Sequence, residues 1–194
     1  KRKKDDPTTL NNGFSDHEKR QRHSTLAFQH RMHPDISSFP REQFYPPGVL
    51  ANGSRTELDR AWDYQRYQTR NIWLDIRGNT QRNANEKEVH AIIRELKAFC
   101  DWAAGKHKNS KKEAYDVAVL TFYTGQEKSL RALLQQLPGN KGRYARFDYK
   151  GISIKLATVD YFQGQEADVV FLSMVNTYRD GFMDSPNRLN VSFT

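Results

Sequence analysis

Two short polar motifs in this chain contain residues that could bind a phosphorylated ligand. The first, Gln29-His-Arg-Met-His-Pro34, carries an arginine, whose planar and always ionised guanidinium matches the geometry of phosphate oxygens. The second, Gln163-Gly-Gln-Glu166, carries a carboxylate, which is a strong acceptor of hydroxyl protons. An arginine and two histidines near a proline also suit a surface ion pair and a helix cap, and turns rich in Gln and Glu are common. The residue types alone leave both interpretations open.

Four apolar runs, rich in β-branched or aromatic residues, predict the buried strands that position these motifs: 71–76, 116–122, 152–159 and 168–175. Apolar residues at helical spacing predict a helix over 85–104 and a second one after Gly125 that stops at Pro138-Gly139. Strands that alternate with helices indicate a doubly wound α/β layer with a mainly parallel sheet. The ligands of such sheets bind beyond the carboxyl ends of the strands, and we expect every polar motif to lie at such an end.

The length and composition of the chain limit the class of protein to which it can belong. Its 194 residues suit one domain, and no apolar run approaches the ~20 residues of a membrane span, so we expect no membrane partner. The single cysteine, Cys100, can build neither a disulfide framework nor a cysteine metal site. We therefore expect no metal site in this chain and an intracellular location, in the cytoplasm, the nucleus or the nucleoid.

The positive charge of the chain suggests a polyanionic partner without identifying it. The formal net charge is +8, of which residues 1–24 carry +3. We expect residues 1–24 to be a mobile basic leader and residues 25–194 to be the folded domain. The connection over 54–70 interleaves arginines with aromatic residues. It could offer stacking faces and phosphate contacts to a single strand, or it could pack its own aromatic side chains.

Two elements of a complete nucleotide-hydrolysing site are missing from the chain. It contains no Gly-x-x-x-x-Gly-Lys-Ser/Thr loop, whose backbone amides would cradle phosphates. It also contains no Asp-Glu metal-binding pair directly after a strand. We therefore expect this chain alone to be inactive as an ATPase.

The motifs together resemble the second RecA-like lobe of superfamily 1 helicases, in the branch of the nonsense-mediated decay and senataxin helicases. Residues 29–34 are similar to the family's Gln-Tyr-Arg-Met-His-Pro, and the strand end at 119–126 resembles Thr-Pro-Tyr-x-x-Gln. The segment 158–175 matches the family's strand, Gln-Gly-Gln-Glu loop and strand. The segment 184–194 resembles Arg-Arg-Leu-Asn-Val-Ala-Leu-Thr-Arg, whose last arginine, the family's finger onto the γ-phosphate, would follow Thr194. His30, Phe122 and Asn187 replace the family's tyrosine, proline and first arginine.

The resemblance implies a RecA-like three-layer domain that works as the second motor lobe of an ATP-dependent helicase or translocase. The cofactor would be ATP with Mg²⁺, bound between this lobe and a first RecA-like lobe that holds the metal. The implied partners are that first lobe and single-stranded nucleic acid, either DNA or RNA, with movement from 5′ toward 3′. Each site residue is implied by its match to a motif: Arg31, Gln163 and Arg188 for catalysis, Gln29, His30, Arg31, Gly164 and Glu166 for the cofactor, and Thr121, Tyr123, Gln126 and Thr158 for the nucleic acid.

Two simpler interpretations remain beside the resemblance. A degenerate helicase lobe could bind nucleic acid or a protein without cycling nucleotide, and the departures at His30, Phe122 and Asn187 favour it. Asn85 and Glu88 echo a further element of the family, Asn-x-x-Glu, but a helix N-cap followed by an acidic first turn explains that spacing equally well.

Overall fold

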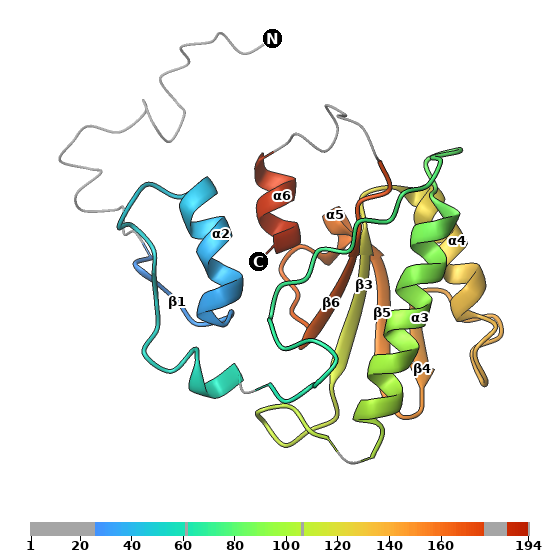
Figure 1. Cartoon of the computed structure of the whole chain (residues 1–194), viewed down its shortest axis with the longest axis horizontal. Helices are drawn as coiled ribbons and strands as arrows, with labels where there is room; N and C mark the ends of the chain where they lie inside the picture. The colour runs from blue at the N-terminus through green and yellow to red at the C-terminus, as the bar shows by residue number, and fades with distance from the viewer. Residues whose placement is uncertain (1–25, 61, 106, 177–185, 194) are drawn as a thin grey trace, which may run out of the picture.

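The computed structural model describes residues 26–60, 62–105, 107–176 and 186–193, so the expected mobile leader over 1–24 lies outside the described residues. Its centre is a four-stranded sheet in the order β4-β5-β3-β6 (Figure 1). The strands β3 (Asp116–Thr121), β5 (Ile152–Thr158) and β6 (Val169–Ser173) are parallel, and β4 (Arg146–Tyr149) pairs with β5 in the antiparallel direction. The predicted α/β class with a mainly parallel sheet is therefore confirmed.

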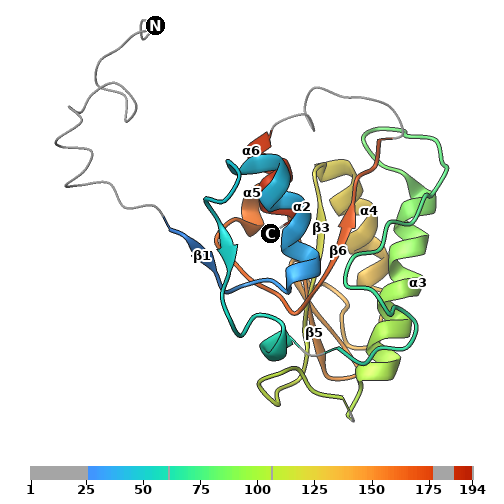
Figure 2. The same ribbon diagram turned by 60° about the vertical axis from the view of Figure 1, so that its left-hand side comes forward.

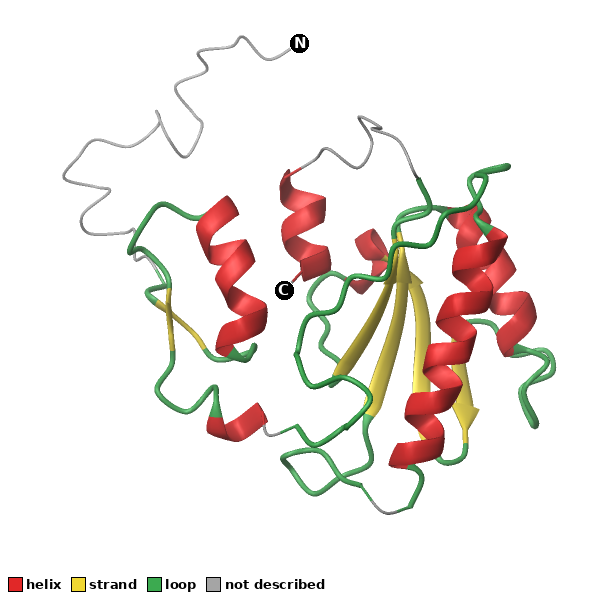
Figure 3. Cartoon of the chain, viewed as in Figure 1, coloured by secondary structure: helices red, strands yellow, loops and turns green. Residues whose placement is uncertain are grey.

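Helices cover both faces of the sheet, as Figure 3 shows, and each face has its own apolar core. In β3 the side chains of Val117 and Val119 join the core under α3 (Glu86–Ala103) and α4 (Thr124–Leu134). Ala118 and Leu120 join the core on the opposite face, beside α5 (Val159–Phe162) and α6 (Pro186–Phe193). Because successive strand residues point to opposite faces, an uninterrupted apolar run is what a strand between two helix layers needs.

The two crossover helices begin and end near the predicted residues. Asn85 caps α3 by accepting the N–H of Glu88 at 3.4 Å, so the capping interpretation of this spacing is confirmed. The helix α4 ends at Leu134, and a turn carries the chain on to Leu137 before Pro138. Among the described residues, no helix is both long and apolar enough to cross a bilayer.

The segment before α3 forms a smaller unit that packs on α6. Its strands β1 (Phe28–Gln29) and β2 (Ala51–Asn52) are parallel and flank α2 (Pro34–Phe44), and the 3-10 helix η1 (Leu58–Arg60) follows (Figure 2). The ring of His33 caps α2, with Nδ1 accepting the N–H of Asp35 at 3.2 Å. The rings of Phe39 on α2 and Phe193 on α6 meet edge to face, with their centroids 5.4 Å apart. This contact attaches the smaller unit to the sheet through α6.

The prediction of a strand over 71–76 is wrong. The segment pairs with no described strand, and the side chain of Trp73 within it is 71% exposed. The longer extended stretch over 71–80 contacts two distant parts of the chain instead: Asn71 Nδ2 donates to the carbonyl of Asp35 at 2.9 Å, and Thr80 Oγ1 donates to the carbonyl of Val175 at 3.0 Å. An apolar run becomes a strand only where a backbone edge lies within hydrogen-bonding distance, and the sequence does not reveal that distance. The antiparallel strand β4 is not among the strands that the sequence predicted.

The aromatic residues of the connection over 54–70 pack on the domain. Trp62 stacks on Phe99 of α3, with centroids 5.9 Å apart and planes 8° apart, and Tyr64 is only 5% exposed. Arg66 Nε lies 2.8 Å from Glu95 Oε2, and this hydrogen-bonded pairing lowers the pKa of Glu95 to about 2. Because these aromatic faces are used inside the protein, the packing interpretation of this connection is confirmed.

Candidate functional site

Gln29 organises the loop that carries Arg31. Its Oε1 accepts the N–H groups of Arg31 at 2.9 Å and Met32 at 2.8 Å, while its Nε2 donates to the carbonyl of Met32 at 2.9 Å and to Asn52 Oδ1 at 2.6 Å. Both ends of the amide are therefore used within the protein, where they fold the backbone of 29–32 into a tight turn. The structure gives Gln29 a supporting role beside the predicted contact with the cofactor.

Arg31 and Glu166 meet although 135 residues separate them in the sequence. Arg31 Nε donates to Glu166 Oε1 at 2.9 Å, and the two side chains are 43% and 59% exposed. Beside them Gly164 has φ of +79°, and no atom lies within 4 Å of the position that a β-carbon would take there. A ligand can approach this stretch of backbone closely, because neither a side chain nor a neighbouring atom blocks it. The sequence pointed to these three residues, and the structure brings Arg31 and Glu166 together.

The Gln163–Glu166 loop lies away from the expected edge of the sheet. It follows α5, and the chain then begins β6 at its amino end, where the N–H of Asp168 donates to the carbonyl of Asp116 at 2.9 Å. Glu166 is two residues from that point. The expectation that every polar motif lies at a carboxyl end is therefore wrong for Glu166, because the segment 159–168 returns across the sheet before β6 starts.

Two of the predicted nucleic-acid residues lie side by side at the carboxyl edge, where Thr121 of β3 is the register partner of Thr158 of β5. Both side chains are buried, as is that of Tyr123, whose hydroxyl accepts from Asn176 Nδ2 at 2.8 Å. The first residue of α4, Thr124, is exposed at the same edge. A ligand at this edge could therefore reach Thr124 and the polar groups at the start of α4 more easily than the two buried threonines.

Gln126 is fully buried and joins three elements. Its Oε1 accepts the N–H of Asn85 at 2.8 Å, and its Nε2 donates to Ser173 Oγ at 2.8 Å and to the carbonyl of Asn85 at 3.3 Å. Close by, Glu88 accepts the N–H of Val175 at 2.9 Å and the hydroxyl proton of Ser173. This network ties the start of α3 to α4 and to the end of β6, which the motif around Gln126 did not reveal.

The remaining predicted catalytic residues, Arg188 and Gln163, lie beside the two ends of α5. Arg188 Nε on α6 pairs with Asp160 Oδ1 at 3.1 Å, at the start of α5, and Gln163 is exposed at its end. Two neighbouring residues escaped the sequence motifs: Asn52 of β2, which binds Gln29, and the following Gly53, against which the ring of His30 packs. The Asn-Gly pair was the only local signal, and it is usually a turn signal.

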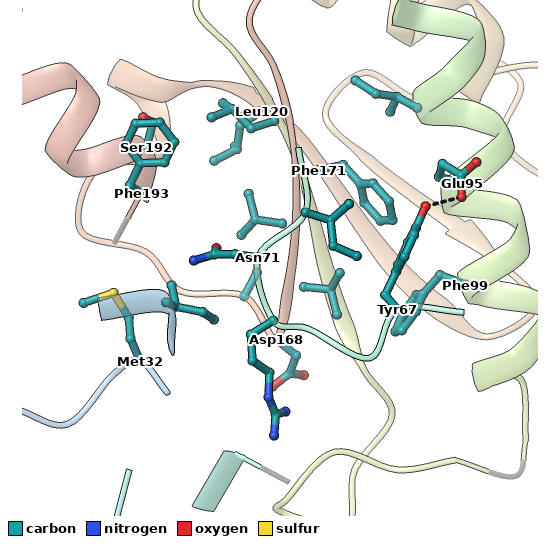
Figure 4. Close-up of a pocket in the computed structure, with 18 of the residues that line it drawn as sticks. Met32, Tyr67, Asn71, Glu95, Phe99, Leu120, Asp168, Phe171, Ser192 and Phe193 are labelled. Atoms are coloured by element: carbon teal, nitrogen blue, oxygen red, sulfur yellow. Dashed lines mark hydrogen bonds between the residues drawn. The ribbon is translucent and has the colours of Figure 1, made fainter. Parts of the chain in front are cut away.

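A large cavity of about 1540 Å³ lies beside these groups, between β6 and the extended segment over 70–78 (Figure 4). Its apolar wall includes Leu120 and Phe171 of the sheet and Phe193 of α6, and Asp168 lies at one end. Arg31 and Glu166 are among the polar residues that line it. Among the described residues, no group of three His, Cys, Asp or Glu side chains could hold a metal ion.

Known proteins resemble this chain over most of its length. A family model described as "AAA domain" matches residues 8–194. The "Helicase sen1" of Schizosaccharomyces pombe is 30% identical over 178 residues, and the "ATP-dependent helicase upf1" of the same yeast is 30% identical over 174 residues; each match covers 87% of this chain. The chain belongs to the helicase family of the nonsense-mediated decay and senataxin branch.

This helicase-family domain is short beside its relatives. The matches cover 10% of the length of "Helicase sen1" and 18% of that of "ATP-dependent helicase upf1". The "Regulator of nonsense transcripts 1 homolog" of Drosophila melanogaster is 31% identical over 176 residues, and 14% of its length is covered. The predicted membership of the superfamily 1 helicases is confirmed.

Proposed function

We propose that this chain is the second motor lobe of an ATP-dependent helicase or translocase that moves along single-stranded nucleic acid inside the cell. The observation that carries the proposal is the Arg31–Glu166 pair beside the open backbone at Gly164, in a domain of a helicase family. These groups suit a nucleoside triphosphate, because a guanidinium binds phosphate oxygens and a carboxylate accepts from ribose hydroxyls.

The two residues would bind opposite ends of the nucleotide. In the proposed complex Arg31 donates to the γ-phosphate oxygens, where charge develops during transfer, and Glu166 accepts from the ribose. The 2.9 Å contact between their side chains therefore has to open when ATP enters. Both are about half exposed, so the pair contributes little to folding and opens at low cost. ATP binding would thereby exchange a contact within the lobe for contacts across a cleft, and closure on a first lobe follows.

The first lobe would supply what this chain lacks. Its phosphate-binding loop would hold the α- and β-phosphates, and its acidic residues would hold Mg²⁺, which neutralises charge on the transferring phosphoryl group. Gln163 and Arg188, at the two ends of α5, would then link the nucleotide with the nucleic acid at the carboxyl edge. The nucleic acid would contact the backbone near Thr121 and Thr158 and the exposed start of α4.

The test compares a polypeptide that contains both lobes with this chain alone, each with and without single-stranded DNA or RNA. We expect ATP turnover that the single strand stimulates in the two-lobed polypeptide and no turnover from the isolated chain. Binding of single strands without ATP turnover would contradict the motor proposal and support a binding module. Turnover by the isolated chain would contradict the assignment of the phosphate loop to another lobe.

A further inference from the structure

An exposed tyrosine, Tyr144, lies on the loop between α4 and β4. It is 69% exposed, although the guanidinium of Arg131 on α4 covers its ring at 3.8 Å from the centroid. A guanidinium stacks well on an aromatic face, because it is planar and weakly hydrated. Arg131 is itself buried and is held by an ion pair with Glu127. One face of the tyrosine ring is therefore supported by the protein, and the other face is open to solvent.

The backbone of this loop is fixed by hydrogen bonds from the end of α4 and from β5. The consecutive carbonyls of residues 143, 144 and 145 each accept one hydrogen bond. Their donors, in that order, are Gln135 Nε2 at 2.7 Å, Arg131 Nε at 2.9 Å and the N–H of Leu156 at 2.9 Å. A ring on a fixed backbone loses little conformational freedom when a ligand stacks on it, so little of the binding free energy is spent on ordering the loop.

Tyr144 lies near the carboxyl edge of the sheet. The hydrogen bond between the Ala145 carbonyl and β5 is made two residues before Thr158, the last residue of that strand. Lys128 is exposed on α4, three residues before Arg131, and residues at this spacing are neighbours on a helix surface. A single strand that passes Thr158 and the start of α4 can therefore continue past Lys128 to the open face of Tyr144.

The charged side chains beside the ring are mostly basic. Lys141, Arg143 and Arg146 are exposed, and none of them forms an ion pair with any residue that the structure describes. Along residues 138–150 the only acidic residue is Asp148. Cations beside an open aromatic face suit a single strand of nucleic acid, because the cations contact phosphates while the ring stacks on a base.

We propose that Tyr144 is a stacking platform for a base of single-stranded nucleic acid, and that Lys141 and Arg143 contact the adjoining phosphates. The inference rests on the proposed function for the path of the strand, but the site lies outside every motif that the sequence analysis named. It needs no ATP. Because every base has a π-face, the platform adds affinity for the strand with little preference for its sequence.

The stacking contact is tested by fluorescence anisotropy on the two-lobed polypeptide without ATP. The probes are an oligodeoxythymidylate of about 15 nucleotides and an abasic strand of the same length, which keeps the phosphates but has no base to stack. We expect Tyr144→Ala to bind the oligodeoxythymidylate about tenfold more weakly, because one stacked base contributes on that scale. The same variant should bind the abasic strand within about twofold of the unaltered polypeptide.

Two matched variants separate stacking from a structural role of the side chain. Tyr144→Phe keeps the aromatic face and should bind the oligodeoxythymidylate within about twofold of the unaltered polypeptide. Tyr144→Leu keeps an apolar side chain beside Arg131 but has no π-face, so it should lose about as much affinity as Tyr144→Ala. Normal binding by Tyr144→Leu, or equal losses for both probes in Tyr144→Ala, would overturn the inference.

The phosphate contacts are tested by the salt dependence of binding. The double variant Lys141→Ala with Arg143→Ala should bind both probes more weakly. The slope of log affinity against log salt concentration should fall by about 1.4, because each phosphate contact on a single strand releases about 0.7 counterion. An unchanged slope would contradict the proposed roles of Lys141 and Arg143.

ATP turnover separates this inference from the proposed function. If a saturating single strand stimulates turnover while Tyr144→Ala binds both probes normally, the inference fails and the motor proposal stands. If no strand stimulates turnover but Tyr144→Ala loses affinity for the oligodeoxythymidylate alone, the motor proposal fails and the inference stands. An unaltered polypeptide that binds neither probe would overturn both.

Discussion

Replacing Gln126 by alanine tests whether this residue is structural, as its contacts indicate, or available to nucleic acid, as the motif implies. The variant loses the hydrogen bonds to Ser173 Oγ and to both backbone groups of Asn85. A typical hydrogen bond contributes about 1 kcal/mol net, and a buried N–H left without a partner costs about 1–3 kcal/mol. Because the N–H of Asn85 loses its acceptor in a fully buried place, we expect a loss of about 2–4 kcal/mol in the free energy of unfolding.

Urea unfolding followed by tryptophan fluorescence measures this loss, since Trp62 and Trp102 pack together around Phe99 and report the core. A loss of this size is a large fraction of the ~5–15 kcal/mol of a typical domain, so the midpoint should fall clearly while the slope stays constant. The control is Gln68→Ala, an exposed glutamine that should change stability by less than about 0.5 kcal/mol. A Gln126→Ala variant as stable as the control would refute the reasoning and return Gln126 to the candidate nucleic-acid residues.

Two further predictions concern ionisable groups of the α3 layer. The pKa of Glu95 is lowered to about 2 in the folded protein by its hydrogen bond with Arg66, so the stability it contributes is present above its ordinary pKa of 4.5 and is lost as the pH falls toward 2. The difference in urea midpoint between the unaltered chain and Glu95→Gln should therefore shrink from pH 6 to pH 2.5; a constant difference would contradict the ion pair. Burial raises the pKa of Cys100 to about 12, so its thiol should react with a maleimide at pH 8 only after urea unfolding, and fast labelling of the folded chain would show that α3 opens.

The sequence predicted the parts of the fold that local patterns determine. The strands β3 and β6 consist mainly of consecutive apolar residues, and β5 carries apolar residues at Ile152, Ile154, Leu156 and Ala157. The helix α3 starts at a capping asparagine with a stripe of apolar residues behind it. The run over 71–76 is also rich in apolar residues, but whether it forms a strand depends on how near the edge of β6 lies. A pattern of side chains does not encode that distance, so the strand prediction failed.

The candidate site was also predictable only where a local motif was sufficient. The motifs pointed to Arg31 and Glu166, but only the fold shows that these side chains meet. The hydrogen bonds of Gln126 reach Asn85, 41 residues away, and therefore its burial was not visible in the strand-to-helix motif. The contact between His30 and Gly53 likewise depends on the register of two short strands.

The central claim, that Arg31 acts on the γ-phosphate across a cleft, is tested most directly by single-turnover ATP hydrolysis in the two-lobed polypeptide. An arginine that stabilises the transferring phosphoryl group can be worth about 10³–10⁵ in turnover, so we expect Arg31→Ala to slow hydrolysis about a thousandfold while ATP affinity changes only a few-fold. Arg94→Ala, which removes an arginine of α3 from its ion pair with Glu95, is the control and should hydrolyse ATP normally. Hydrolysis by Arg31→Ala within threefold of the control would contradict the account.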